Sequence, residues 1–183
     1  MTRDDDASRR ADLVRRAQRG DARAFADLAR ASGRAVYAIA LAHLGRPSDA
    51  EDVAQDVLLA ALENIGACRE PERFDAWIVV IARNRARRAL VRRRLRDVFR
   101  GPAPEIAAPS REGQELDRDA LLRALSALPA RTREVVLLHD LEGWEHAELA
   151  PALGITEEGS RQILSRARRR MREVLAELEE KQR

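Results

Sequence analysis

Charged residues gather in separate stretches of this 183-residue sequence. Arginines concentrate at 83–100 and 161–172, and acidic residues at 4–6, 49–56 and 173–180. A guanidinium can hold a phosphate or a guanine edge through two parallel hydrogen bonds. Separate basic and acidic patches predict two partners of different charge. We expect nucleic acid to contact the basic patches. The choice of Arg over Lys, which occurs once at Lys181, also fits a GC-rich genome.

Catalytic chemistry would need a nucleophile with a base, or a cluster of metal ligands. The three histidines, His43, His139 and His146, are far apart in sequence. The acidic cluster at 49–56 contains no His or Cys. An enzyme acting on DNA is therefore the least favoured function class, and we expect no metal, no cofactor and no catalytic residue.

Composition predicts an intracellular helical protein. Hydrophobic residues make up 45% of the chain, aromatic residues only 3%, and the net charge is +3. The single Cys68 excludes an internal disulfide and fits a reducing cytosol. No apolar run approaches the roughly 18 residues that span a bilayer, and the polar N-terminus does not resemble a signal peptide. We expect a cytoplasmic protein without membrane insertion.

The spacing of apolar residues predicts an all-α fold of two small helical domains joined by a flexible linker. The linker is 101–113, which contains three Pro and two Gly. It separates a helical bundle, 1–100, from a four-helix unit, 114–183. Gly20-Asp21 predicts a helix boundary, and Ser48 with Glu51 forms a capping-box pattern at the start of another helix.

The helix predicted from Ser48 has an apolar stripe and an acidic face. Leu59 lies within the acidic face. It is either an ordinary exposed apolar residue or part of a docking surface. The next predicted helix, within 74–100, begins with apolar residues and ends with arginines. Its Trp77 has helical spacing to Phe74 and Ile81, so it is either a core residue or a DNA contact.

Residues 144–170 have the layout of a helix-turn-helix. A short helix at 145–153, a turn at Gly154-Ile155 and a helix capped by Thr156 match that geometry. On the second helix, Glu158, Arg161, Ser165, Arg168 and Arg172 share one face. Basic and short polar side chains on one face are typical of a helix that reads the major groove, although a solvated charged helix has the same pattern.

Three motifs together resemble bacterial RNA polymerase sigma factors of the sigma-70 family, in the extracytoplasmic-function (ECF) group. The segment 48–62, SDAEDVAQDVLLAAL, resembles the polymerase-docking motif of region 2. The segment 74–93 resembles the FxxWLxxIARN stretch of the same region. The segment from about 124 to 173 resembles region 4. The resemblance covers nearly the whole chain and implies promoter-specific initiation with core polymerase.

The resemblance also implies roles for individual residues. Docking on the β′ clamp helices of core polymerase would use Asp49, Glu51, Asp52, Gln55, Asp56 and Leu59. Recognition and melting of the −10 element would use Asn64, Gly66, Cys68, Arg69, Trp77, Arg83, Asn84, Arg87 and Arg88. Recognition of the −35 element would use Arg131, Arg133, Glu158, Ser160, Arg161, Gln162, Ser165 and Arg168. Promoter DNA and an anti-sigma factor are the other implied partners.

The sequence departs from the family pattern at three places. Cys68 stands where an aromatic residue is frequent, Val79-Val80 where Tyr-Arg is usual, and Gly159-Ser160 where Thr-Val is usual. Because Gly159-Ser160 lies in the predicted recognition helix, the −35 specificity is the least transferable inference. The alternative to a sigma factor is a free-standing helix-turn-helix regulator, but such a regulator has no need for the acidic docking face at 49–59.

Overall fold

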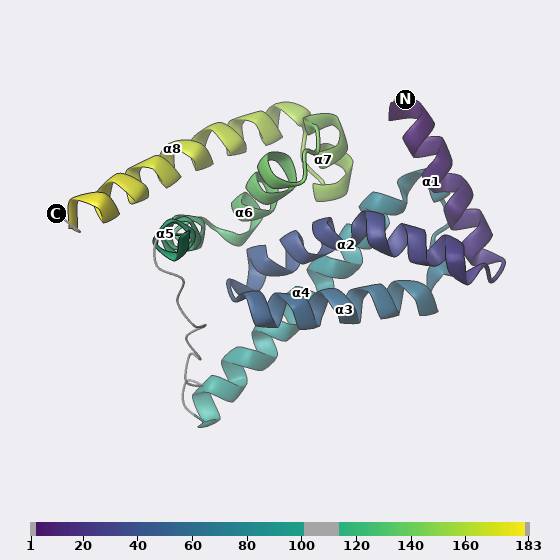
Figure 1. The fold of residues 1–183 in the computed structure, drawn as a ribbon, viewed down its shortest axis with the longest axis horizontal. Helices are drawn as coiled ribbons and strands as arrows, with labels where there is room; N and C mark the ends of the chain where they lie inside the picture. Colours follow the sequence, from purple (N-terminus) through teal and green to yellow (C-terminus); the bar gives the residue numbers. More distant parts are fainter. Residues whose placement is uncertain (1–2, 101–113, 182–183) are drawn as a thin grey trace.

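The computed structural model describes residues 3–100 and 114–181, and every regular element within these ranges is helical (Figure 1). The predicted linker, 101–113, lies outside the described residues. The elements are α1 (Arg3–Gln18), α2 (Ala22–Leu44), α3 (Pro47–Glu63), η1 (Ile65–Ala67), η2 (Pro71–Arg73), α4 (Phe74–Arg100), α5 (Gln114–Ser126), α6 (Ala130–Val136), η3 (Leu137–Leu141), α7 (His146–Leu153) and α8 (Glu157–Lys181). The all-α prediction is confirmed.

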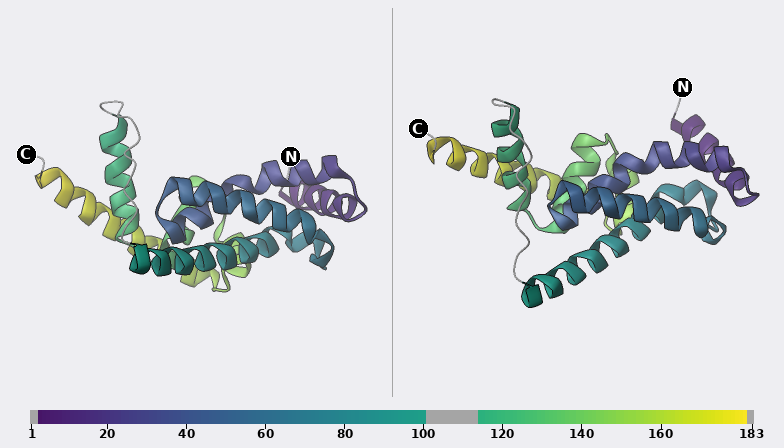
Figure 2. Two further views of the ribbon diagram at one scale, coloured as in Figure 1. Left: turned by 90° about the horizontal axis from the view of Figure 1, so that it is seen from below. Right: turned by 60° about the horizontal axis from the view of Figure 1, so that its bottom comes forward.

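The first unit is a bundle in which α2 lies between α3 and α4 and packs against both. Leu28 and Ile39 of α2, Val57 of α3 and Ile78 of α4 are fully buried in its core. Helix α1 packs along α2 and covers the short turns η1 and η2. The C-terminal half of α4 projects away from this bundle (Figures 1 and 2).

Local sequence signals explain most helix ends in this unit. The Asp21 carboxylate accepts hydrogen bonds from the backbone N–H groups of Arg23 and Ala24, which caps α2 as predicted. Gly45 ends α2 in the left-handed conformation, with φ of 69°. The predicted capping box at Ser48 is wrong. Helix α3 begins one residue earlier, at Pro47, because the fixed φ of proline suits the first helical position.

The second unit contains α5 to α8. Helices α6 and α7 pack against α8, and α5, the first helix of this unit, crosses α8 nearer its C-terminal part (Figure 1). Leu138 of η3 and Leu149 of α7 are fully buried at its centre. Residues 137–141 form a π-helical turn that directly follows α6.

The two units lie in direct contact in this structure. Helix α2 contacts α6 and η3, and α4 contacts α7. The buried apolar residues of both units form one continuous cluster. This contact covers part of α4, which the sequence predicts to bind DNA, so it bears directly on the function of the chain.

Candidate nucleic-acid and docking interfaces

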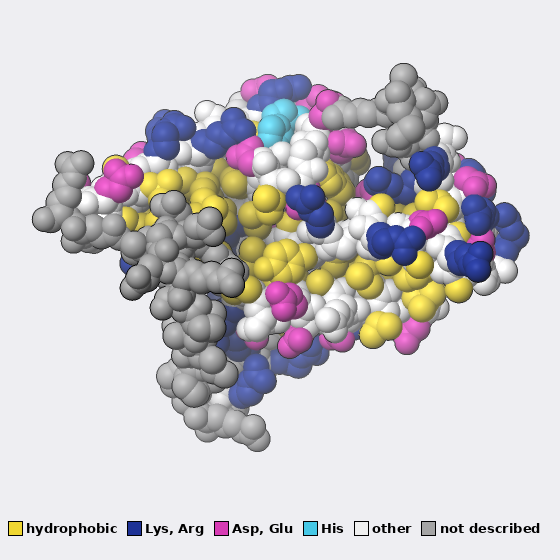
Figure 3. Space-filling model, in the orientation of Figure 1, with side chains coloured by type: hydrophobic (Ala, Val, Ile, Leu, Met, Phe, Trp, Pro, Cys, Tyr) yellow, Lys and Arg dark blue, Asp and Glu magenta, His cyan; other side chains and the backbone are white. Residues whose placement is uncertain are grey.

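The acidic face of α3 lies on the surface, opposite its buried stripe. The buried side consists of Ala50, Val53, Ala54, Val57, Ala60 and Ala61. Glu51, Asp52, Gln55 and Asp56 are exposed on the other side, and Leu59 is 60% exposed. Figure 3 shows acidic and apolar side chains beside one another over α3, with arginines nearby over α4. The structure thus places an exposed leucine among carboxylates, as the predicted docking surface requires.

Asp49 differs from the other acidic residues of α3. Its carboxylate accepts a hydrogen bond of 2.8 Å from Nη1 of Arg93, which also donates to the Leu44 carbonyl at 2.9 Å. Arg93 therefore joins α4 to the end of α2 and the start of α3. Asp49 therefore stabilises the bundle in this structure. The exposed acidic face of α3 consists of Glu51, Asp52, Gln55 and Asp56.

The turn after α3 is held in place by α1. Gln18 Nε2 donates hydrogen bonds to the backbone carbonyls of Ile65 (3.2 Å) and Cys68 (2.8 Å). The Asn64 side chain donates to the Ala60 carbonyl at 2.9 Å. Gly66 and Arg69 are exposed and can meet a partner. Sequence reasoning missed Gln18, because its partners lie about fifty residues further along the chain.

Cys68 is a correction to the predicted DNA contacts. It is only 2% exposed and belongs to the core of the first unit. Burial raises the pKa of its thiol, so the group is neutral and apolar in character. The Cys68 thiol therefore packs inside the turn and offers no surface to a base.

Helix α4 presents Asn84, Arg87 and Arg88 to solvent. Trp77 is partly buried and packs against the core, with its ring centroid 5.8 Å from that of Phe74. Part of the indole therefore packs in the core, and the rest reaches the surface, where the predicted DNA contact stays a prediction. The exposed residues two to three turns beyond it form a basic face suited to phosphates.

Arg83 is the exception on α4, because its side chain is 16% exposed and bonded to the second unit. Its Nε and Nη2 donate to the two carboxylate oxygens of Glu134 at 2.9 and 3.0 Å. His43 Nε2 lies 2.7 Å from Glu134 Oε1. Burial opposes ionisation of Glu134, yet the bonds from His43 and Arg83 outweigh it and lower the pKa of the carboxyl.

The helix-turn-helix prediction is confirmed in its geometry. Glu145 and Glu148 form a capping box at the start of α7, and Gly154 ends that helix with φ of 64°. Thr156 Oγ1 accepts a hydrogen bond from the Gly159 N–H at the start of α8. A Cβ on Gly159 would lie 3.0 Å from that oxygen, so the absence of a side chain leaves room for the cap.

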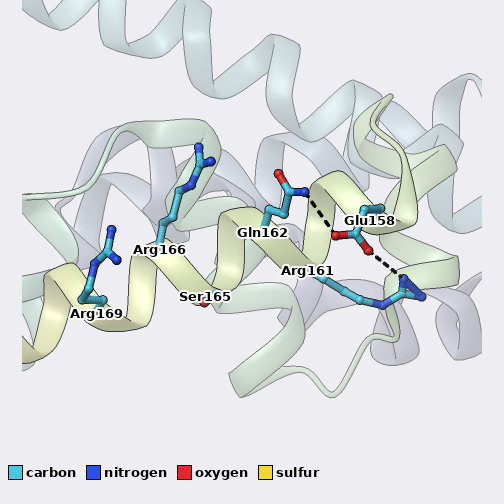
Figure 4. A pocket seen from close by; sticks show the side chains of 6 residues that line it. All are labelled: Glu158, Arg161, Gln162, Ser165, Arg166 and Arg169. Carbon is cyan, nitrogen blue, oxygen red and sulfur yellow. Dashed lines mark hydrogen bonds and ion pairs between the residues drawn. The ribbon is translucent and has the colours of Figure 1, made fainter.

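The outward face of α8 is a shallow basic surface (Figure 4). Glu158, Arg161, Gln162 and Ser165 line it as predicted, and Arg166 and Arg169, which sequence reasoning left out, line it too. Glu158 accepts a bond of 3.1 Å from Gln162, and Arg161 donates to Glu157 at 2.9 Å. Arg168 instead forms an ion pair with Asp140 of η3.

Ser160 is a second correction to the predicted DNA contacts. It is 0% exposed, and its hydroxyl is bonded to His146 Nδ1 at 2.9 Å. Burial, with the adjacent His139 ring, lowers the pKa of His146 and favours its neutral form. Ser160 therefore joins the two helices of the motif through a polar contact where an apolar residue is usual in the family.

The two predicted phosphate contacts of α6 also have internal partners. Arg131 Nη2 donates to the carbonyls of Leu153 and Gly154, at 3.1 and 3.2 Å, and so binds the C-terminal end of α7. The Arg133 side chain lies against Gly45 of the first unit. Arg131 is exposed and can contact a phosphate while it supports the turn, whereas Arg133 is partly covered.

Within the part of the chain that the structure describes, no three His, Cys, Asp or Glu side chains gather as a metal site requires. No described helix combines the length and the apolar character needed to cross a bilayer.

Comparisons with known proteins identify two regions of the chain. Residues 28–96 match Sigma-70 region 2, and residues 118–171 match Sigma-70, region 4. The ECF RNA polymerase sigma factor SigL of Mycobacterium tuberculosis is 34% identical over 150 residues, which cover 78% of this chain and 84% of SigL. One of the relatives is longer than this chain, which spans 41% of that relative's length.

Two solved structures have the same arrangement of helices. CnrH, in complex with the cytosolic domain of CnrY, superposes with a TM-score of 0.70 at 25% identity, covering 92% of this chain and 97% of CnrH. RpoE of Bartonella quintana, in complex with the anti-sigma factor NepR, gives a TM-score of 0.60 at 27% identity, over 78% of this chain and 90% of RpoE. The chain therefore belongs to the sigma-70 family of RNA polymerase sigma factors, in its ECF group.

Proposed function

We propose that the chain docks on core RNA polymerase through the exposed face of α3 and directs initiation from promoters with −35 and −10 elements. The observation that carries the docking step is Leu59, 60% exposed among the carboxylates of Asp52 and Asp56. An apolar side chain ringed by charges gains burial only with a partner, and the charges select a basic one. The basic partner in the family is the pair of β′ clamp helices.

The domains divide the work of promoter recognition. Residues 1–100, acting as region 2, contact the −10 element through Asn64, Gly66, Arg69, Trp77, Asn84, Arg87 and Arg88, with Arg83 joining once it is free. Residues 114–183, acting as region 4, contact the −35 element through Arg131, Glu158, Arg161, Gln162, Ser165 and Arg168. The segment 101–113 connects them. Bases that leave the stack during melting are captured by the protein, which offsets the cost of unstacking without nucleotide hydrolysis.

The protein acts as a specificity subunit in the cytoplasm, and catalysis belongs to the polymerase. The likeness to RpoE bound to its anti-sigma factor supports regulation by such a protein. A free-standing regulator would have no use for the acidic surface on α3, and the sigma-factor relatives do not favour that alternative.

The docking step is tested by charge reversal on α3. In the Asp52→Lys/Asp56→Lys variant, we expect affinity for core polymerase to fall by about a hundredfold, since like charges then oppose the partner. Binding is measured by fluorescence anisotropy of the labelled chain. The matched control is Glu177→Lys/Glu180→Lys, which makes the same change in net charge at exposed positions far along α8. Equal affinities of the two variants would disprove the docking surface.

Promoter specificity needs a separate experiment. Core polymerase with the wild-type chain is given a library of random promoter sequences, and transcripts are sequenced. We expect selected −35 and −10 motifs at a fixed spacing. Binding to core polymerase without selection of any motif would contradict the proposed function.

A further inference from the structure

Glu134 is an unusual residue in this structure, because it is a carboxylate that is 1% exposed at a contact between domains. It belongs to α6 of the second unit, and both of its bonded partners, His43 of α2 and Arg83 of α4, belong to the first. Both oxygens are engaged, one by two donors and the other by one. A buried carboxylate is stable only with such partners, so its position depends on the two units being together.

We propose that Glu134, His43 and Arg83 form an interdomain latch that holds the free chain closed and keeps Arg83 away from DNA until the latch opens. The part that concerns DNA rests on the proposed function. Arg83 uses the same two nitrogens for Glu134 that a phosphate would need. The carboxylate and a phosphate therefore compete for one guanidinium, and the two bonded states exclude each other.

Other groups at the same contact oppose closure. Arg133, next to Glu134, has a buried Nε without a hydrogen-bond partner among the described residues, and burial lowers the pKa of its guanidinium. Asp75 of α4 pairs with Arg10 of α1, yet burial raises its pKa and the nearby Glu148 of α7 adds to this rise. Opening would expose the Arg133 guanidinium to water and separate Asp75 from Glu148. In the closed state, the favourable bonds of Glu134 are partly offset by these unfavourable groups. A partner that binds the open chain can therefore shift the equilibrium, because it need supply only the free-energy difference between the two states.

A second ion pair crosses the same contact and provides a matched control. The distance from Nε of Arg34, in α2, to Oε2 of Glu142 is 3.1 Å, and the arginine side chain is 73% exposed. The Glu142 side chain is 10% exposed, but water solvates the arginine well, so this pair should contribute less to closure than the bonds of Glu134. Loss of Arg34 should therefore leave the chain closed, whereas loss of the Glu134 charge should open it.

The latch is tested in the full chain by small-angle X-ray scattering. We expect Glu134→Gln to raise the ratio of open to closed molecules by about tenfold or more, since Arg83 then remains buried beside a neutral amide. The expected signature is a larger radius of gyration with unchanged helix content by circular dichroism. Arg34→Gln is expected to scatter like the wild type. A Glu134→Gln chain that stays as compact as the wild type would overturn the proposal.

A second variant covers the possibility that Glu134→Gln fails to fold. Arg83→Gln removes the two-bond partner from the other side of the contact. Scattering should again report opening, and an unchanged radius would overturn the latch equally well.

The withholding of Arg83 is tested with short fluorescein-labelled single-stranded DNA at low salt. Glu134→Gln should bind this DNA more tightly in proportion to its open fraction, because apparent affinity scales with the population of the competent state. Arg83→Gln should open without this gain. If Glu134→Gln opens but binds DNA no better, Arg83 is not withheld by the latch. Failure of the wild-type chain to select promoters with core polymerase would refute the proposed function and leave the scattering result standing.

Discussion

Helices α4 and α8 have similar arginine-rich sequences but different accessibility in this structure. The face of α8 around Arg161 and Gln162 is open to solvent (Figure 4). On α4, Arg87 and Arg88 are open in the same way, whereas Arg83 is bonded to Glu134 of the other unit. A charge pattern in the sequence therefore identifies a polar face of a helix. Whether each charge on that face is free to bind a partner depends on which distant segment packs against it.

The largest effect is expected from removing the support of α8. Leu149 of α7 is fully buried against the second unit's core. Leu149→Ala should lower the free energy of unfolding by about 2–5 kcal/mol, because it leaves a cavity as well as losing apolar burial. Chemical denaturation measures this loss. Ala147→Gly on the exposed side of the same helix is the control, and it should cost about 1 kcal/mol or less.

The open face of α8 should respond to charge reversal. Arg161→Glu is expected to weaken binding to a −35 duplex, selected with the promoter library, by about ten- to a hundredfold, through loss of an attractive contact and gain of a repulsive one. Arg123→Glu on α5 reverses an exposed charge away from this face. Anisotropy titrations compare the two, and similar losses in both would mean that the effect is only one of net charge.

Acidification should weaken the contact between the two units at Glu134. The pKa of Glu134 in the closed chain is below its ordinary value of 4.5. Its contribution to closure is therefore complete above 4.5 and is lost as pH falls through the lower value. Scattering across this range should show opening in the wild type. His43 and Arg83 face the carboxylate directly, so Glu134→Gln, which lacks the titrating group, should show no corresponding transition.

The smallest effect is expected at Ser160. Ser160→Ala removes its hydrogen bond to His146, and this should cost about 1 kcal/mol of stability. Because Ser160 is buried, base preference at the −35 element should stay the same. The library experiment measures that preference. A changed −35 motif with unchanged stability would return Ser160 to the DNA-contacting set.

The sequence predicted helix ends and exposed faces correctly at several places where all the interacting residues lie within one short segment. The caps at Asp21 and Thr156 and the turn at Gly154 involve neighbours a few residues apart, so their spacing is visible in the chain. The acidic face of α3 also follows from periodicity, because every third or fourth residue returns to the same side of a helix.

Errors arose where the deciding partner is distant in sequence. Cys68 and Ser160 look available on a helix or loop, but other helices bury them. Gln18 supports the turn after α3 from a helix that carries no obvious motif. Pairing across such separations depends on how helices pack, and periodicity on one helix contains no information about it.

The amino-acid sequence alone determined an all-α chain, its helix-turn-helix, its two basic helices and the exposed acidic face with Leu59. These properties follow from local propensity, capping and periodicity. Tertiary structure alone decided that Glu134 meets His43 and Arg83, and that Arg133 is covered beside them. Glu134, His43 and Arg83 are 40 to 91 positions apart along the chain, and only the packing of the second unit on the first brings their charges within bonding distance.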